Sequence, residues 1–141
     1  MSEAMQKKRV LLIDDEDMVS RLLKLNLEQA GSYEVKIENQ AARSLAAVRQ
    51  FKPDTILLDI VMPERNGMEV AQDIWSEDGL KHIPIIFFSA TIAKRGVRSL
   101  GGAPTLPKPS SVKDIVKCIE HNLIRHPMPD TGGLDNADFG G

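Results

Sequence analysis

Two kinds of hydrophobic pattern alternate along the chain: short unbroken apolar runs and longer segments with a helical period. The unbroken runs, at residues 10–13, 55–58 and 83–88, predict strands that are buried on both faces of a sheet. At residues 33–37, apolar and polar side chains alternate, which is typical of a half-exposed edge strand. A short fifth strand is expected near residues 103–106.

The segments between these strands carry the period of amphipathic helices. Apolar residues fall at positions 19, 22, 23, 27 and 30 in the first segment, at 41, 45 and 48 in the second, and at 67, 71 and 74 in the third. Gly31 and Pro53 supply stop signals after the first two helices. The last helix is expected to begin near Val112, because Ser111 and Asp114 have the spacing of a capping box.

Strands that alternate with helices predict an α/β fold, in which helices cover both faces of a parallel sheet. We therefore expect a doubly wound, five-stranded parallel sheet. In open sheets of this kind, ligands bind beyond the carboxyl ends of the strands. Any functional site should lie at that edge.

Polar residues follow four of the five expected strands. Asp14 and Asp15 come after the first strand, Asp59 after the third, Ser89 after the fourth and Lys108 after the fifth. Each alone has an ordinary explanation: acids favour a helix N-terminus, serine favours turns, and lysine is usually solvated. Because all of them fall at the same edge of the sheet, we interpret them as one functional site.

Composition narrows the possible functions. The chain has 141 residues and a net charge of -2 with scattered basic residues, so one domain is expected and no nucleic-acid partner. No apolar stretch is long enough to span a membrane, the N-terminus lacks the core of a signal peptide, and the cytoplasm is the expected location. Cys118 lies in an apolar helical pattern and is interpreted as a core residue.

The chain ends are expected to lie outside the domain. Residues 1–7 are assigned to an N-terminal extension, residues 8–126 to the domain, and residues 127–141, rich in Gly, Pro and Asp, to a flexible tail or linker. A stand-alone protein and a fragment of a longer regulator or hybrid kinase both fit this pattern.

The motifs at the strand ends resemble those of the response regulator receiver domain of bacterial two-component signalling. The resemblance covers about residues 8–125 and rests on the Asp14-Asp15 pair, the sequence LLDIVMPERNG around Asp59, Ser89-Ala90 and Lys108-Pro109. It implies a flavodoxin-like three-layer fold with strand order 2-1-3-4-5. It also implies a phosphoryl-accepting switch in place of an ordinary enzyme.

The resemblance assigns roles to single residues. Asp59 corresponds to the phosphoacceptor, which takes its phosphoryl group from the phospho-histidine of a histidine kinase or a histidine phosphotransfer protein. The expected metal is Mg²⁺ or Mn²⁺, held by Asp14, Asp15, Asp59 and the backbone carbonyl of Val61. Hard oxygen ligands suit these ions.

Two further residues correspond to the groups that meet the phosphoryl group. Ser89 matches the hydroxyl and Lys108 the lysine, whose ammonium is a compact charge suited to phosphate. A cis Lys108–Pro109 bond is also implied, and proline lowers the energy of that isomer.

The sequence departs from the family in two places. Thr105 occupies the position of the usual aromatic switch residue, and residues 91–102, which include Gly96, Gly101 and Gly102, are fewer than is common. We therefore expect a short or frayed fourth helix that reorders on phosphorylation. The signalling face expected from the resemblance lies around helix four, strand five and helix five, where it would control a protein partner or an output domain.

Three alternative functions compete with this interpretation. A flavin-binding carrier is disfavoured because the acids at residues 14–17 would repel a flavin phosphate. A phosphatase of the haloacid dehalogenase type needs a second Asp where this chain has Val61. A receiver-like module that binds partners without being phosphorylated remains the open alternative.

Overall fold

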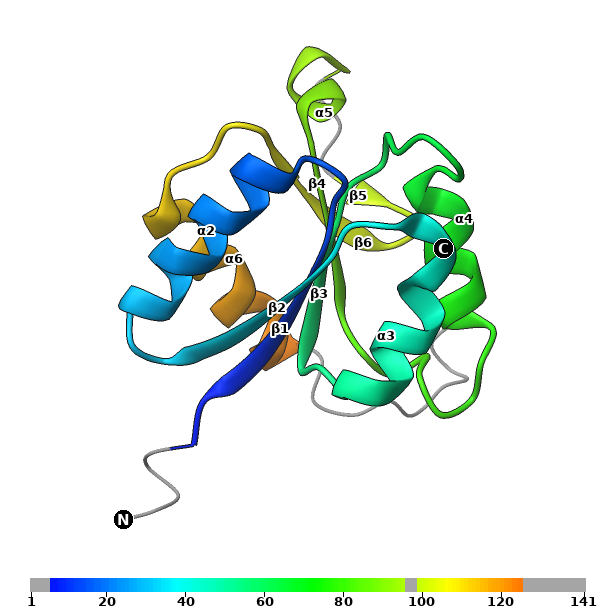
Figure 1. Ribbon diagram of the computed structural model, residues 1–141, viewed down its shortest axis with the longest axis horizontal. Coiled ribbons are helices and arrows are strands. Elements are labelled where there is room, and N and C mark those ends of the chain that lie inside the picture. The colour runs from blue at the N-terminus through cyan, green and yellow to red at the C-terminus, as the bar shows by residue number, and fades with distance from the viewer. Residues whose placement is uncertain (1–5, 96–98, 126–141) are drawn as a thin grey trace.

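The computed structural model describes residues 6–95 and 99–125, which build one sheet with helices on both faces (Figure 1). The tail expected at residues 127–141, and most of the extension expected at residues 1–7, lie outside the described residues. Among the residues that are described, no helix is both long and apolar enough to cross a membrane.

Five parallel strands run in the predicted order. Their order in the sheet is β2-β1-β3-β4-β6. The label β5 belongs to a sixth strand, which lies between β4 and β6 in the sequence but outside β6 in the sheet. The strand bounds are β1 (Lys8–Ile13), β2 (Tyr33–Glu38), β3 (Thr55–Leu58), β4 (Ile85–Ser89) and β6 (Ala103–Pro107). The predicted fold class is thus confirmed, although the fourth strand begins two residues later than expected and includes Ser89.

The sixth strand, β5 (Ser99–Leu100), was not predicted. It pairs antiparallel with β6 and forms the outer edge of the sheet. The preceding helix, α5 (Ala90–Arg95), is short, as expected. Instead of fraying a helix, as the sequence predicts, Gly101 and Gly102 connect β5 to β6 with φ angles of 58° and 87°. Glycine adopts such angles without steric strain, and a tight hairpin turn requires them.

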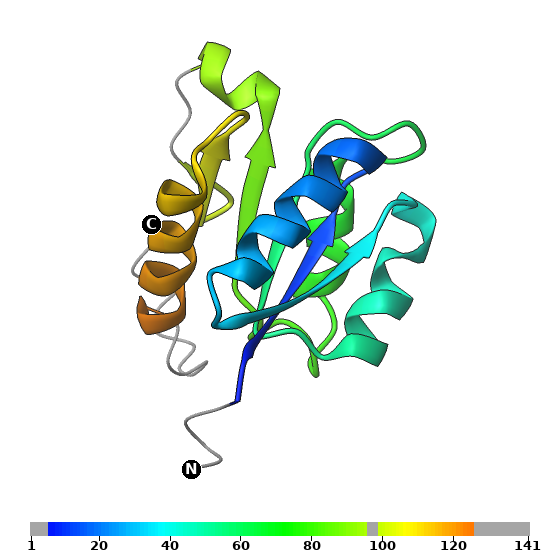
Figure 2. The ribbon, with the colours of Figure 1, turned by 60° about the vertical axis from the view of Figure 1, so that its left-hand side comes forward.

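Helices form a layer on each face of the sheet. Helices α2 (Asp17–Gln29) and α6 (Val112–Arg125) cover one face, and α3 (Ser44–Phe51) and α4 (Gly67–Trp75) cover the other (Figures 1 and 2). A short 3-10 turn, η1 (Ala41–Arg43), precedes α3. Successive strand residues point to opposite faces. As a result, Leu11 and Ile13 pack under α3 and α4, whereas Val10 and Leu12 pack under α2 and α6.

The buried stripe of α2 differs from the one expected. Ser20, Leu23 and Leu27 face the sheet, whereas Val19 is 47% and Leu22 is 59% exposed. The three buried residues follow the i, i+3, i+7 spacing of a narrow helical stripe. The other two lie on the flank of the helix. The sequence pattern predicted the helix correctly and its inward face only in part.

The loop between β3 and α4 is fixed by a close backbone contact at Gly67. The amide of Gly67 donates to the carbonyl of Ile60 at 2.6 Å, and Asn66 and Glu69 form a capping box at the start of α4. A Cβ added to Gly67 would lie 2.2 Å from the backbone oxygen of Asp59. Only glycine fits there, so Gly67 holds the chain immediately after Asp59 in place.

We expect Gly67→Ala to lower the free energy of unfolding by at least about 2 kcal/mol, because the new methyl group overlaps backbone atoms that cannot move independently. Urea denaturation followed by circular dichroism measures this change. Gly79→Ala is the matched control: no atom lies within 4 Å of its added Cβ. Its effect should stay within about 0.5 kcal/mol. Equal effects of the two substitutions would contradict the packing argument.

Candidate functional site

Asp14 and Asp59 are held side by side by the backbone ladder of the sheet. Asp14 follows β1 and Asp59 follows β3, and the amide of Asp59 donates to the carbonyl of Ile13 at 2.9 Å. Both side chains are nearly buried, with residue exposures of 1% and 5%, whereas Asp15 is only partly buried. One carboxylate oxygen from each of Asp14, Asp15 and Asp59 lies within 4.8 Å of the others. The predicted acidic cluster therefore exists.

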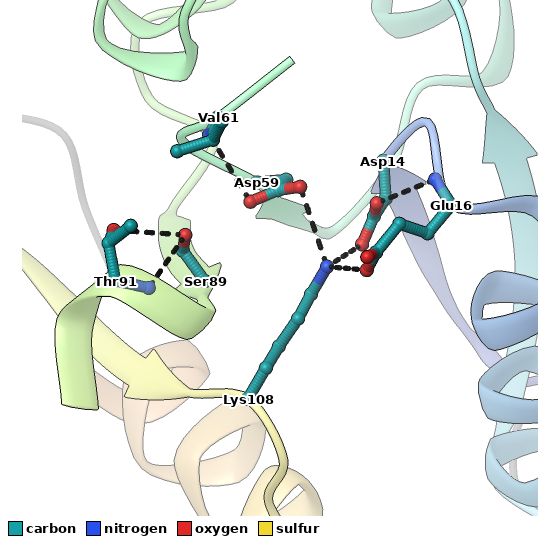
Figure 3. A network of polar contacts seen from close by, with 7 residues as sticks. All are labelled: Asp14, Glu16, Asp59, Val61, Ser89, Thr91 and Lys108. Carbon is teal, nitrogen blue, oxygen red and sulfur yellow. Dashed lines mark hydrogen bonds and ion pairs between the residues drawn. The ribbon is translucent and has the colours of Figure 1, made fainter. Parts of the chain in front are cut away.

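Lys108 reaches this cluster from the loop that follows β6. Its Nζ lies 2.5 Å from Oδ2 of Asp14, 2.7 Å from Oε1 of Glu16 and 3.4 Å from Oδ2 of Asp59 (Figure 3). The backbone amide of Lys108 donates to the carbonyl of Ser89 at 3.2 Å, which fixes the start of the side chain beside β4. The Lys108–Pro109 peptide bond is cis, as expected.

The surroundings of Asp59 and Lys108 change the acidity of these two groups. Burial, and then the negative charge of Asp14, raise the pKa of Asp59 to about 6, against smaller opposing effects of Lys108, the Val61 amide and Ser89. Burial by itself would lower the pKa of Lys108. Its hydrogen bonds with Asp14 and Glu16 outweigh that effect and raise the pKa. Asp59 is therefore ionised at neutral pH, and Lys108 stays charged.

Ser89 lies on the other side of a cavity of about 320 Å³ that also contains Asp59 and Lys108. The Ser89 side chain is buried, and its Oγ lies 3.2 Å from the hydroxyl of Thr91, where either group can donate. The amide of Val61 donates to Oδ1 of Asp59 at 3.3 Å. A phosphate-sized group attached to Asp59 would thus face both an ammonium and a hydroxyl (Figure 3).

Sequence reasoning missed two residues of this cavity, Glu16 and Thr91. Glu16 is one of the four consecutive acids at residues 14–17; its side chain makes no capping bond at the start of α2 and pairs with Lys108 instead. Thr91 lies in the segment where the sequence predicts the fourth helix. Their positions, one and two residues after predicted site residues, were the only available signal. The residues lining the cavity do not include Thr105, which pairs with Phe87 in the sheet.

The oxygen donors of the cluster fit a hard divalent cation. Asp14, Asp15 and Asp59 supply carboxylate oxygens, the ligand type that Mg²⁺ and Mn²⁺ prefer. The single ammonium of Lys108 does not balance the charges of these three carboxylates. The three acids could therefore bind a metal.

Comparison with known proteins gives one matching family and a set of similar structures. The family model described as the response regulator receiver domain matches residues 10–120. The non-phosphorylated HemR receiver domain from Leptospira biflexa is 29% identical, with a TM-score of 0.69, 89% of this chain covered and 100% of that chain. A putative response regulator from Chloroflexus aurantiacus is 26% identical, with a TM-score of 0.73 and coverages of 85% and 100%.

A sensor protein from Polaromonas sp. has a TM-score of 0.76 at 21% identity, with 84% of this chain and 98% of that chain covered. At that identity the similarity shows the fold alone. The same sheet and helices thus occur in proteins whose sequences have diverged widely.

We expect Asp59→Asn to stabilise the metal-free protein. The pKa of Asp59 is higher in the folded chain than its ordinary value of 3.8, so ionisation destabilises the fold, and the penalty becomes complete above about pH 6. For a fully buried group, this rise in pKa would lower the free energy of unfolding by about 3 kcal/mol. We expect Asp59→Asn to raise the free energy of unfolding by about 1–2 kcal/mol at pH 8, because the cavity is open to solvent, which screens the charges.

The measurement is urea denaturation in EDTA at pH 8 and pH 5. At pH 5 the increase in the free energy of unfolding should be about half of that at pH 8, since Asp59 is then largely protonated in the folded wild type. Asp78→Asn is the control, because the side chain of Asp78 is 95% exposed. A destabilised Asp59→Asn variant, or a gain that does not change with pH, would contradict this prediction.

Proposed function

The chain belongs to the response regulator receiver domain family, a signalling module of two-component systems and not a classical enzyme, and on that premise we propose that Asp59 accepts a phosphoryl group from a phospho-histidine. The observation that carries the proposal is the meeting of Asp14, Asp59 and Lys108 at the carboxyl edge of the sheet. Family membership implies a histidine kinase as the source of the phosphoryl group. The donor protein itself is either that kinase or a histidine phosphotransfer protein.

In the proposed transfer, an ionised carboxylate oxygen of Asp59 attacks the phosphorus atom and forms an acyl phosphate. The bond from phosphorus to the donor histidine nitrogen breaks, and its electron pair stays on that nitrogen, which then takes up a proton. Phosphoryl transfer of this kind depends mainly on positioning and on stabilising the charge of the transferring oxygens. The rigid loop between β3 and Gly67 provides the positioning for Asp59.

Lys108 and Ser89 are proposed to meet the phosphoryl oxygens. Lys108 already lies 3.4 Å from Asp59, and its charge would follow the new negative charge as the group arrives. The Ser89 hydroxyl can exchange its contact with Thr91 for a hydrogen bond to a phosphoryl oxygen. Ala90, which also lines the cavity, leaves the approach uncrowded.

Asp14, Asp15 and Asp59 are proposed to hold Mg²⁺, with Mn²⁺ as a substitute and the backbone carbonyl of Val61 as a further ligand. When bound, the ion would offset the charge of the carboxylates and of the phosphoryl oxygens. The support for this assignment is the oxygen-only donor set and the proximity of the three carboxylates.

Phosphorylation is proposed to alter the face formed by α5, β6 and α6, which would control a protein partner or an output domain. The phosphoryl group adds about 1.5 to 2 negative charges beside Ser89. Ser89 ends β4, and α5 begins at the next residue, so movement of the hydroxyl acts directly on that helix. Residues 8–126 are proposed as the receiver unit, operating in the cytoplasm.

The phosphorylation test uses acetyl phosphate as the donor and intact-mass spectrometry as the readout. With Mg²⁺ present, the wild type and Asp78→Asn should each gain one phosphoryl group, and Asp59→Asn should gain none. EDTA should abolish the gain in the wild type. If no variant is modified, the chain is an interaction module of receiver fold; if Asp59→Asn is modified equally, the phosphoacceptor is another residue.

Amide hydrogen exchange tests the proposed signalling face. Beryllofluoride with Mg²⁺, a stable mimic of the phosphoryl group, should change protection in α5 and β6 by about tenfold or more while leaving β2 unchanged. Strand β2 is the control because it lies at the opposite edge of the sheet. Unchanged protection in α5 and β6 with the mimic bound would rule out this face as the switch.

A further inference from the structure

Lys108 divides its charge among three carboxylates, and the closest two are not the proposed phosphoacceptor. Its Nζ lies 2.5 Å from Asp14 and 2.7 Å from Glu16, whereas Asp59 is 3.4 Å away. An ammonium group has three N–H donors, so each carboxylate occupies one of them. In this arrangement Glu16 holds a donor that a phosphoryl group on Asp59 would need.

Of these three carboxylates, Glu16 can leave Lys108 most easily. The side chains of Asp14 and Asp59 are 2% and 6% exposed and would lose a compensating charge in a poorly solvated place. The side chain of Glu16 is 54% exposed, so water can replace the ammonium. Glu16 has room to move, because it lines both the cavity of Asp59 and a neighbouring groove of about 320 Å³ under α2.

The local structure before α2 does not depend on the side chain of Glu16. It precedes α2, but its carboxylate makes no capping hydrogen bond. Its backbone amide, not its side chain, donates to Oδ1 of Asp14 at 3.0 Å. Changing the charge of Glu16 should therefore leave the turn and the helix intact.

Building on the proposed function, we propose that Glu16 is a positioning residue that competes with Asp59 for Lys108 and so limits phosphoryl binding at this site. While the site is empty, Glu16 draws the ammonium toward α2. When a phosphoryl group arrives, Lys108 must break its ion pair with Glu16 to bind a phosphoryl oxygen. The loss of that ion pair reduces the favourable free energy of the new contact between Lys108 and the phosphoryl group. Glu16 thereby sets how readily the switch is turned on.

Glu16→Gln tests the proposal, because it removes the charge and keeps the shape. We expect its affinity for beryllofluoride with Mg²⁺, followed by fluorine NMR, to rise about two- to fivefold, the range of a partly exposed ion pair. Asp17→Asn is the matched control: it removes the same charge one residue away, on a side chain that pairs with Arg21 and not with Lys108. Its affinity should change less than about 1.5-fold.

A second measurement distinguishes the release of Lys108 from Glu16 from a general weakening of the negative electrostatic potential at the site. Phosphorylation rates are compared for acetyl phosphate and for phosphoramidate, which carries less negative charge. Release of Lys108 should speed both donors alike in Glu16→Gln, whereas a weaker repulsive field should favour acetyl phosphate. Equal changes in Glu16→Gln and Asp17→Asn, a gain in Glu16→Gln confined to acetyl phosphate, or a weaker affinity in Glu16→Gln would overturn the proposal. A wild type that accepts no phosphoryl group would instead overturn the proposed function.

Discussion

The site depends on one electrostatic constraint: several carboxylates share a small space at the edge of the sheet, and one ammonium lies among them. The backbone ladder between β1 and β3 forces Asp14 and Asp59 together whatever their charges. Lys108 offsets part of the repulsion, but the pKa of Asp59 remains raised. A cluster with unbalanced negative charge favours the binding of a cation, and such a cation would in turn offset the charge of an arriving phosphoryl group.

The rest of the fold makes this arrangement rigid. The central strands are buried on both faces, so the residues at their ends have little freedom to separate. Close contact at Gly67 fixes the chain after Asp59, and the bond from Lys108 to the carbonyl of Ser89 fixes the lysine loop. Stability of the core thus maintains a local charge repulsion that would otherwise relax.

The side of the sheet formed by β6 and β5 carries the chain's own features. A short α5 and the β5–β6 hairpin occupy the region where a longer helix is common in the family, and the Gly101 turn lies against the Trp75 ring. Thr105 pairs with Phe87 within the sheet. Signalling through this edge would therefore involve a helix of six residues and a hairpin instead of a large aromatic side chain.

The sequence by itself determined the alternation of strands and helices, the parallel sheet and the residues at each strand end, because burial imposes periodicity and parallel strands end at one edge. Only the tertiary structure decided which partners Lys108 takes, that Ser20 and not Leu22 faces the sheet, and that two glycines form a hairpin. These outcomes depend on distances between segments far apart in the chain, on which local patterns carry no information. The pairing of Glu16 with Lys108, 92 residues away, is the clearest case.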